Sequence, residues 1–213
     1  MKFNLYLIAF IYCFVSHAAI SAEREFPSID EFIATLPVNH DKQVIEGDLN
    51  NDQLLDKVVF EAKRVIQPSS PMYEELKIHI LLKKGNGNFY IAQTSKMAPV
   101  TLLDKFFRGG EIRNGSLFIE FEGGLHPSFV RYQFKHYKGQ WRLIGMTDSA
   151  SDPYRTLPDG GVASNGADIN LLTGDIEYIS DEKQSARKRI GIKPCYLADF
   201  DFSEEFVDKH CKK

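Results

Sequence analysis

The clearest structural signal in this chain is the stretch Phe129-Val-Arg-Tyr-Gln-Phe-Lys-His-Tyr137, which Lys138-Gly139 separates from Trp141-Arg-Leu-Ile-Gly-Met146. Apolar and polar residues alternate from Val130 to Phe134, so every second side chain lies on the same face of a strand. The Lys-Gly pair is typical of a tight turn between antiparallel strands. We therefore predict a β-hairpin that buries one face.

Similar short apolar runs, separated by turn residues, occupy most of the chain. Further hairpins are predicted at Gly85-Asn-Gly-Asn88, Asn114-Gly115 and Thr173-Gly174. The sequence contains 16 Phe and 9 Tyr, residues that pack well on pleated sheets. We expect a mainly β fold, namely a single antiparallel meander or sandwich-like domain with a short N-terminal helix, and an α+β fold is the alternative.

Helices are expected only near the two ends of this domain. Ser28-Ile-Asp-Glu31 has the spacing of a capping box, and the helix that it begins should stop before Pro37. Segment Ser203–Cys211 is a second candidate helix, with Ser203 as its cap. Two stretches, 64–74 and 147–167, are rich in Pro, Ser, Gly and Asp and are predicted to be long loops.

The first 22 residues have the three parts of a secretory signal peptide. Lys2 is followed by an uncharged apolar run from Phe3 to Val15 and then by small residues, with cleavage expected after Ala22 or after Ala18. An uncleaved anchor is the alternative, but the run is shorter than the roughly 20 residues of a membrane span. We expect a single domain at 23–213, located in the periplasm or secreted, without a membrane span.

Charge and cysteine content narrow the class further. Cleavage of the signal removes Lys2 and no acid, so the formal net charge moves from −3 to −4, which argues against a nucleic-acid partner. Cys195 and Cys211 are then the only cysteines left. In an oxidising compartment they are expected to form a disulfide that contributes about 3 kcal/mol. Two unpaired thiols are the alternative.

An acidic loop is the one stretch whose residue pattern indicates a specific ligand. Glu46-Gly-Asp-Leu-Asn-Asn-Asp-Gln-Leu-Leu-Asp56 places oxygen-bearing side chains at alternate positions. Calcium prefers six to eight such hard oxygen ligands. The predicted ligands of a structural Ca²⁺ are the side chains of Asp48, Asn50, Asp52 and Asp56 together with the backbone carbonyl of Leu54. A metal-free turn rich in Asn and Asp is the alternative reading.

This loop resembles the Asp-x-Asn-x-Asp-Gly-x-x-Asp loop of FG-GAP repeats, in which the ion joins two strands. The resemblance implies a calcium site, but Gln53 stands where the family usually has a glycine with positive φ. The chain also resembles a group of exported bacterial proteins of unknown function, through Glu46-Gly-Asp-Leu-Asn50, Gly139-Gln-Trp-Arg-Leu-Ile-Gly145 and Asn170-Leu-Leu-Thr-Gly174. That resemblance implies an architecture and no established activity.

No set of residues has the spacing of a known catalytic site. His126 lies near Ser128 after two glycines, but there is no Gly-x-Ser-x-Gly elbow and no Cys–His arrangement. Glu120 and Glu122 share a strand face and are interpreted as solvated charge. We therefore expect a non-catalytic binding module whose partner is a protein or a component of the cell envelope. The alternative is an envelope hydrolase with a site around His126 and the 147–167 loop.

Overall fold

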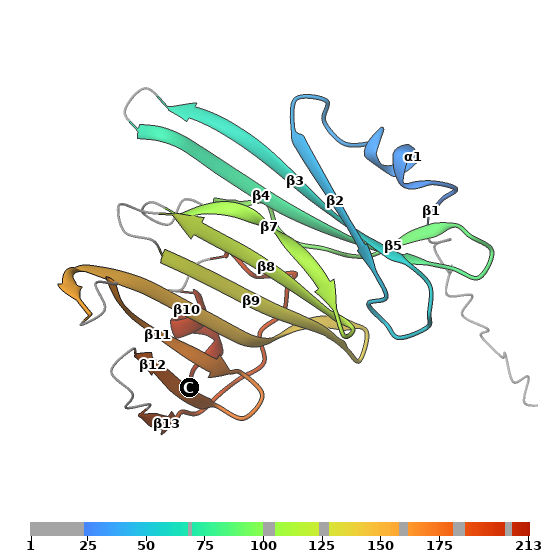
Figure 1. Ribbon diagram of the computed structural model, residues 1–213. Helices are drawn as coiled ribbons and strands as arrows, with labels where there is room; N and C mark the ends of the chain where they lie inside the picture. Colours follow the sequence, from blue (N-terminus) through green and yellow to red (C-terminus); the bar gives the residue numbers. More distant parts are fainter. Residues whose placement is uncertain are drawn as a thin grey trace, which may run out of the picture.

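The computed structural model describes residues 24–67, 70–99, 105–123, 128–157, 162–180, 186–202 and 206–213. The predicted signal peptide lies outside these ranges. Within them, no helix is long and apolar enough to cross a membrane. The chain is mainly β, as the sequence predicts, and its strands form two antiparallel sheets (Figure 1).

The first sheet, sheet A, has the strand order β1-β5-β4-β3-β2, and β6 also pairs with β4. It is drawn in blue to green in Figure 1. The helix α1 follows β1 in the chain. The bounds are β1 Glu25–Phe26, α1 Ile29–Ile33, β2 Asp41–Gly47, β3 Asp56–Gln67, β4 Ser70–Lys83, β5 Phe89–Thr94 and β6 Ala98–Pro99.

The second sheet, sheet B, is a meander in which each strand pairs with the next along the chain. Its edge strand β7 lies beside β2 of sheet A. The bounds are β7 Lys105–Arg113, β8 Ser116–Gly123, β9 Ser128–Tyr137, β10 Gln140–Thr156, β11 Val162–Asn170, β12 Asp175–Ser180 and β13 Arg187–Arg189. A single π-helical turn, η1 Val207–Cys211, follows near the C-terminus.

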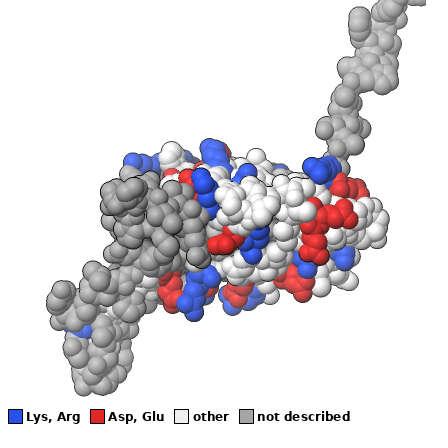
Figure 2. Space-filling view, turned by 90° about the horizontal axis from the view of Figure 1, so that it is seen from above, with Lys and Arg blue, Asp and Glu red and all other residues white. Residues whose placement is uncertain are grey.

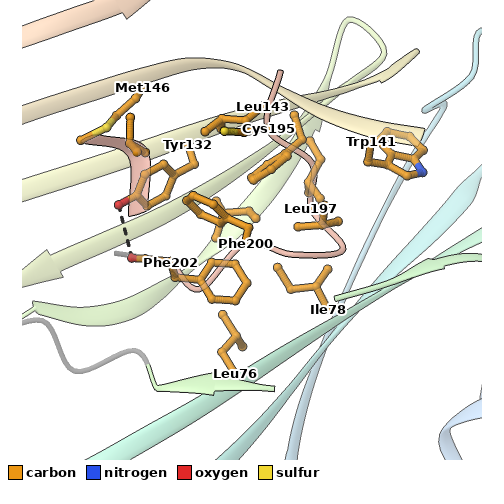
Figure 3. Packing of buried hydrophobic residues seen from close by; sticks show 14 of the residues in the cluster. Leu76, Ile78, Tyr132, Trp141, Leu143, Met146, Cys195, Leu197, Phe200 and Phe202 are labelled. Carbon is orange, nitrogen blue, oxygen red and sulfur yellow. Dashed lines mark hydrogen bonds between the residues drawn. The ribbon is translucent and has the colours of Figure 1, made fainter. Parts of the chain in front are cut away.

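One hydrophobic core joins the two sheets and the C-terminal segment 195–211 (Figure 3). Phe200 and Phe202 lie between Leu76 of sheet A and Tyr132 of sheet B, and all four side chains are fully buried. The Tyr132 hydroxyl donates a hydrogen bond to the Phe202 carbonyl (3.3 Å). The C-terminal segment therefore packs against both sheets at the centre of the molecule.

The start of the segment is bonded to sheet B, and its end is joined to its start. Leu143 N donates to Cys195 O and Leu197 N donates to Trp141 O, which adds a short strand-like stretch beside β10. Cys195 and Cys211 form the predicted disulfide, with Cα atoms 5.5 Å apart. Such a bridge is consistent with an oxidising compartment.

A smaller core lies on the outer face of sheet A, under α1. Phe26 and Phe32 pack there on Val59, Leu81 and Phe89. Since sheet A buries both of its faces at this point, its strands carry continuous apolar runs rather than strict alternation. The predicted N-cap is confirmed, because Glu31 N donates to Ser28 Oγ (3.2 Å).

The predicted hairpins and their faces are confirmed. Val130, Tyr132 and Phe134 are fully buried. Lys138-Gly139 and Asn114-Gly115 both have positive φ at the two turn positions, which is the geometry of a type I′ turn.

Both predictions of long loops were wrong. The stretch 64–74 is the far end of the β3–β4 hairpin, with Arg64 paired to Glu74, and 147–167 is largely the β10–β11 hairpin, with Thr147 paired to Asp168. Backbone pairing does not need apolar alternation, so polar strands of this kind escape a pattern search. The predicted C-terminal helix is reduced to η1, and Ser203 lies outside the described residues.

Candidate metal site

The acidic loop closes the β2–β3 hairpin, directly after the last backbone pair of Gly47 and Asp56. Asp56 is completely buried. One of its oxygens accepts a hydrogen bond from Leu49 N and the other from Lys83 N, both at 2.9 Å. This carboxylate therefore joins the loop to the end of β4.

Asp48 and Asp52 shape the exposed side of the loop. The two oxygens of Asp48 accept from Asp52 N (3.2 Å) and from Gln53 N (2.9 Å), and Asp52 accepts from Leu54 N (2.8 Å). These bonds turn the backbone through positive φ at Asn51 (62°) and Gln53 (68°). Gln53 thus has a positive-φ backbone conformation that glycine adopts more readily, at a cost of about 1 kcal/mol.

The three carboxylates of Asp48, Asp52 and Asp56 converge. Each contributes an oxygen, and these oxygens lie within 4.8 Å of one another, so the group could hold a metal ion. Burial is the main cause that raises the pKa of Asp56, and Asp52 and Asp48 raise it further, while the two backbone hydrogen bonds act against the rise. A hard cation fits this all-oxygen donor set and would relieve the repulsion.

The other two predicted ligands are less well placed. Asn50 lies in the loop, but its Oδ1 accepts from Asp52 N (3.1 Å) and its Nδ2 donates to Asp52 Oδ2 (2.8 Å). These two hydrogen bonds hold the amide group of Asn50 against Asp52. Leu54 donates its backbone N–H to Asp52, and its carbonyl remains a sequence-based prediction.

The loop also lies against sheet B. A Cβ atom added to Gly115 would come within 2.9 Å of Asn51 Oδ1, so the loop contacts the turn between β7 and β8. Leu49, inside the loop, belongs to the main core. An ion bound here would stiffen the junction between the sheets as well as the hairpin.

A second polar cluster, which the sequence did not reveal, is buried near α1. Glu61 accepts from His40 Nδ1 (2.5 Å) and from His79 Nε2 (2.8 Å), and His79 Nδ1 lies 3.2 Å from Thr94 Oγ1. Burial acts to raise the pKa of Glu61, but the hydrogen bonds from the two histidines outweigh it and lower this pKa. Burial lowers the pKa of His79. The His79 side chain is itself buried.

The residues considered for catalysis do not come together within the described ranges. His126 lies outside those ranges. Ser128 Oγ donates to Gly123 O, and Glu120 forms an ion pair with Arg131 (2.6 Å). His136 packs its ring on Trp141, with centroids 5.3 Å apart. The hydrolase alternative places its site around His126 and a loop at 147–167. Most of that stretch is a β-hairpin and not a long loop.

Comparison with protein-family models, with curated proteins and with solved structures finds no match for this chain. The FG-GAP resemblance therefore rests on the loop residues alone.

Proposed function

We propose that this protein is an exported, non-catalytic binding module whose β2–β3 hairpin is stabilised by one calcium ion. The observation that carries the calcium assignment is the convergence of Asp48, Asp52 and Asp56. Their carboxylates would hold the ion, with the Asn50 side chain and the Leu54 carbonyl as further ligands. Calcium in this position supplies charge neutralisation and rigidity, and no reaction step.

The binding role is supported by the architecture around the loop. Two sheets, a buried disulfide and a core that continues into the C-terminal segment give a rigid body with broad sheet faces. On the part of the surface that is coloured in Figure 2, basic side chains are scattered and acidic ones gather at the right-hand end, without a continuous basic surface. Such a face suits a protein or a cell-envelope component rather than nucleic acid. The predicted signal peptide and the disulfide together support export.

The calcium assignment is tested by thermal unfolding in calcium and in EGTA. A filled site stabilises the folded protein by RT ln(1 + [Ca²⁺]/Kd), which is about 2.7 kcal/mol when the ion is at 100 times Kd. Calcium should therefore raise the melting temperature of the wild-type protein. The variant Asp48→Ala should lose this rise.

Glu111→Ala is a matched control, since Glu111 is a partly exposed acid of β7 whose partner is Arg113. It should keep the full calcium response. If millimolar calcium leaves the wild-type melting temperature unchanged, or if Asp48→Ala responds as strongly as the wild type, the loop is a metal-free turn.

A further inference from the structure

The outer face of sheet B carries a row of hydrogen-bond donors on neighbouring strands. Ser116 of β8 is the cross-strand partner of Lys135 of β9, which is the partner of Arg142 of β10. Arg142 in turn forms an isolated bridge with Tyr196. We call these four residues the donor row. Their neighbours in the chain, Leu117, Phe134, Leu143 and Leu197, are buried in the core, so the donor row lies on the opposite face of the sheet. On that face Lys135 is exposed, Arg142 and Tyr196 are partly exposed, and Ser116 is buried.

Two positive charges lie directly opposite each other in this row. Cross-strand neighbours have Cβ atoms about 5 Å apart, and like charges at that distance destabilise a sheet. Elsewhere on the same sheet, Arg131 is paired with Glu120 (2.6 Å) and Arg187 with Glu177 (3.3 Å). In the part of the chain that the structure describes, no carboxylate forms an ion pair with Lys135 or Arg142. The remaining ion pairs of lysines and arginines there are Lys57–Glu46, Lys63–Glu75, Lys84–Glu25, Lys96–Asp199, Arg108–Glu122, Arg113–Glu111, Arg189–Asp175 and Lys212–Asp208.

Arg142 also has a buried donor without an acceptor. Its Nε is the one buried side-chain nitrogen or oxygen, among the described residues, that makes no hydrogen bond. A buried donor that lacks a partner costs about 1–3 kcal/mol, so such groups are rare in folded proteins. At the other end of the row, Ser116 is buried, and its Oγ accepts from Gln133 Nε2 (3.2 Å). The positive charges of Lys135 and Arg142, which no carboxylate neutralises, call for a ligand with negative charge.

We propose that the donor row binds a phosphate group, held mainly by Lys135 and Arg142. A guanidinium group binds oxyanions through two parallel N–H···O bonds, and a lysine ammonium adds charge. Adjacent strands are about 4.8 Å apart, so Tyr196, which is partly exposed beside Arg142, can offer its hydroxyl to the same group. The phosphate is either free in solution or part of a lipid headgroup.

This inference builds on the binding role proposed above, and it uses none of the residues of the calcium loop, which closes the β2–β3 hairpin of sheet A. It can therefore fail while the calcium response is retained, and the reverse also holds. Measuring both responses on the same samples separates the two outcomes.

The test follows the Arg142 Nε–H signal by NMR as inorganic phosphate is added, with chloride at equal ionic strength as the reference. Phosphate should shift this signal and the amide signals of Lys135 and Arg142. Arg142→Gln should bind phosphate roughly tenfold more weakly, because it loses a charge-assisted hydrogen bond. Arg142→Lys keeps the charge and should recover only part of the affinity. Arg187→Gln, on the same sheet, should bind as the wild type does.

Vesicles distinguish the two sources of phosphate. Arg142-dependent binding to phosphatidylglycerol vesicles, but not to phosphatidylcholine vesicles, supports a lipid headgroup, whereas a response to inorganic phosphate alone supports a soluble ligand. The proposal is overturned if phosphate moves these signals no more than chloride does. It is also overturned if Arg142→Gln binds inorganic phosphate as tightly as Arg187→Gln.

Discussion

At the scale of single residues, the buried cluster of His40, Glu61 and His79 has the clearest consequence. An ionised carboxylate only accepts hydrogen bonds, so both rings donate to Glu61 and each is fixed in one tautomer. His79 Nδ1 then accepts from Thr94 Oγ1. The cluster lies next to Phe32 of α1, whose ring packs edge-on against His79. It therefore helps to position the helix on sheet A.

This cluster makes the stability of the protein depend on pH. The pKa of His79 is lower in the folded state than in the unfolded chain. As pH falls through about 6.5, this histidine is therefore protonated first in the unfolded chain, and acid favours unfolding. The pKa of Glu61 is also lowered in the folded state. Its contribution to stability is therefore present at pH values above its ordinary pKa, and it is lost as pH falls through the pKa that Glu61 has in the folded protein. Both effects reduce stability toward acid pH, and for one proton the slope is at most about 1.4 kcal/mol per pH unit.

The test is the free energy of unfolding in urea between neutral pH and about pH 5, a window that brackets the ordinary histidine value. His79→Gln keeps a donor for Glu61 but cannot titrate, so its stability should fall less steeply than that of the wild type. His136→Gln changes an exposed histidine and should keep the wild-type slope. Equal slopes in all three proteins would show that His79 does not carry the effect.

At the scale of elements, the tight turns show two factors that determine the cost of replacing a glycine: its φ angle and the atoms near the position of the added Cβ. Gly85 has an ordinary φ and open space where a Cβ would stand. Gly139 has open space but a φ of +78°, and Gly115 has a φ of +66° with Asn51 in the way. The three positions therefore separate the cost of the backbone conformation from the cost of a close contact.

Alanine substitutions at these positions should destabilise the protein in a fixed order. Gly85→Ala should be nearly neutral, Gly139→Ala should cost about 1 kcal/mol through its φ, and Gly115→Ala should cost more because Asn51 must also move. Urea unfolding of the three variants measures the order. A Gly115→Ala cost no greater than that of Gly139→Ala would mean that the loop and the β7–β8 turn are not in firm contact.

The same elements show what the sequence could and could not predict. The β7–β8 and β9–β10 hairpins were predictable because Asn114-Gly115 and Lys138-Gly139 stand between alternating runs. The β10–β11 extension was not predictable, since it is held by backbone pairing. The two strands are so close there that a Cβ at Gly166 would lie only 2.1 Å from Asp148 O. The Asp48, Asp52 and Asp56 cluster followed from spacing within one loop, whereas Glu61 and His79 are brought together only by strand register.

At the scale of the whole molecule, the C-terminal segment 195–211 contributes side chains to the centre of the core. Leu197, Phe200 and Phe202 follow no helical or strand period, so no pattern predicts their burial, and only the cysteine pair indicates that this segment is held in place. Phe200 packs against Tyr132, Phe134, Phe202 and Phe206, with ring centroids 4.9 to 5.4 Å apart.

Phe200→Ala should therefore cost about 3–5 kcal/mol, because it removes a fully buried ring at the point where both sheets meet the segment. Tyr137→Ala removes an aromatic residue that is 52% exposed and should cost far less. Chemical denaturation of the two variants measures the difference. Similar costs would mean that the segment is only loosely attached to the sheets.

The central position of this segment also determines when the protein can fold. While a ribosome still covers residues 195–211, the inner faces of both sheets lack the aromatic rings that fill the space between them. Strands paired at that stage would leave Leu76 and Tyr132 facing water. The apolar surface that stabilises the fold can therefore be buried only after residues 195–211 have left the exit tunnel, so the two sheets cannot complete their core before then.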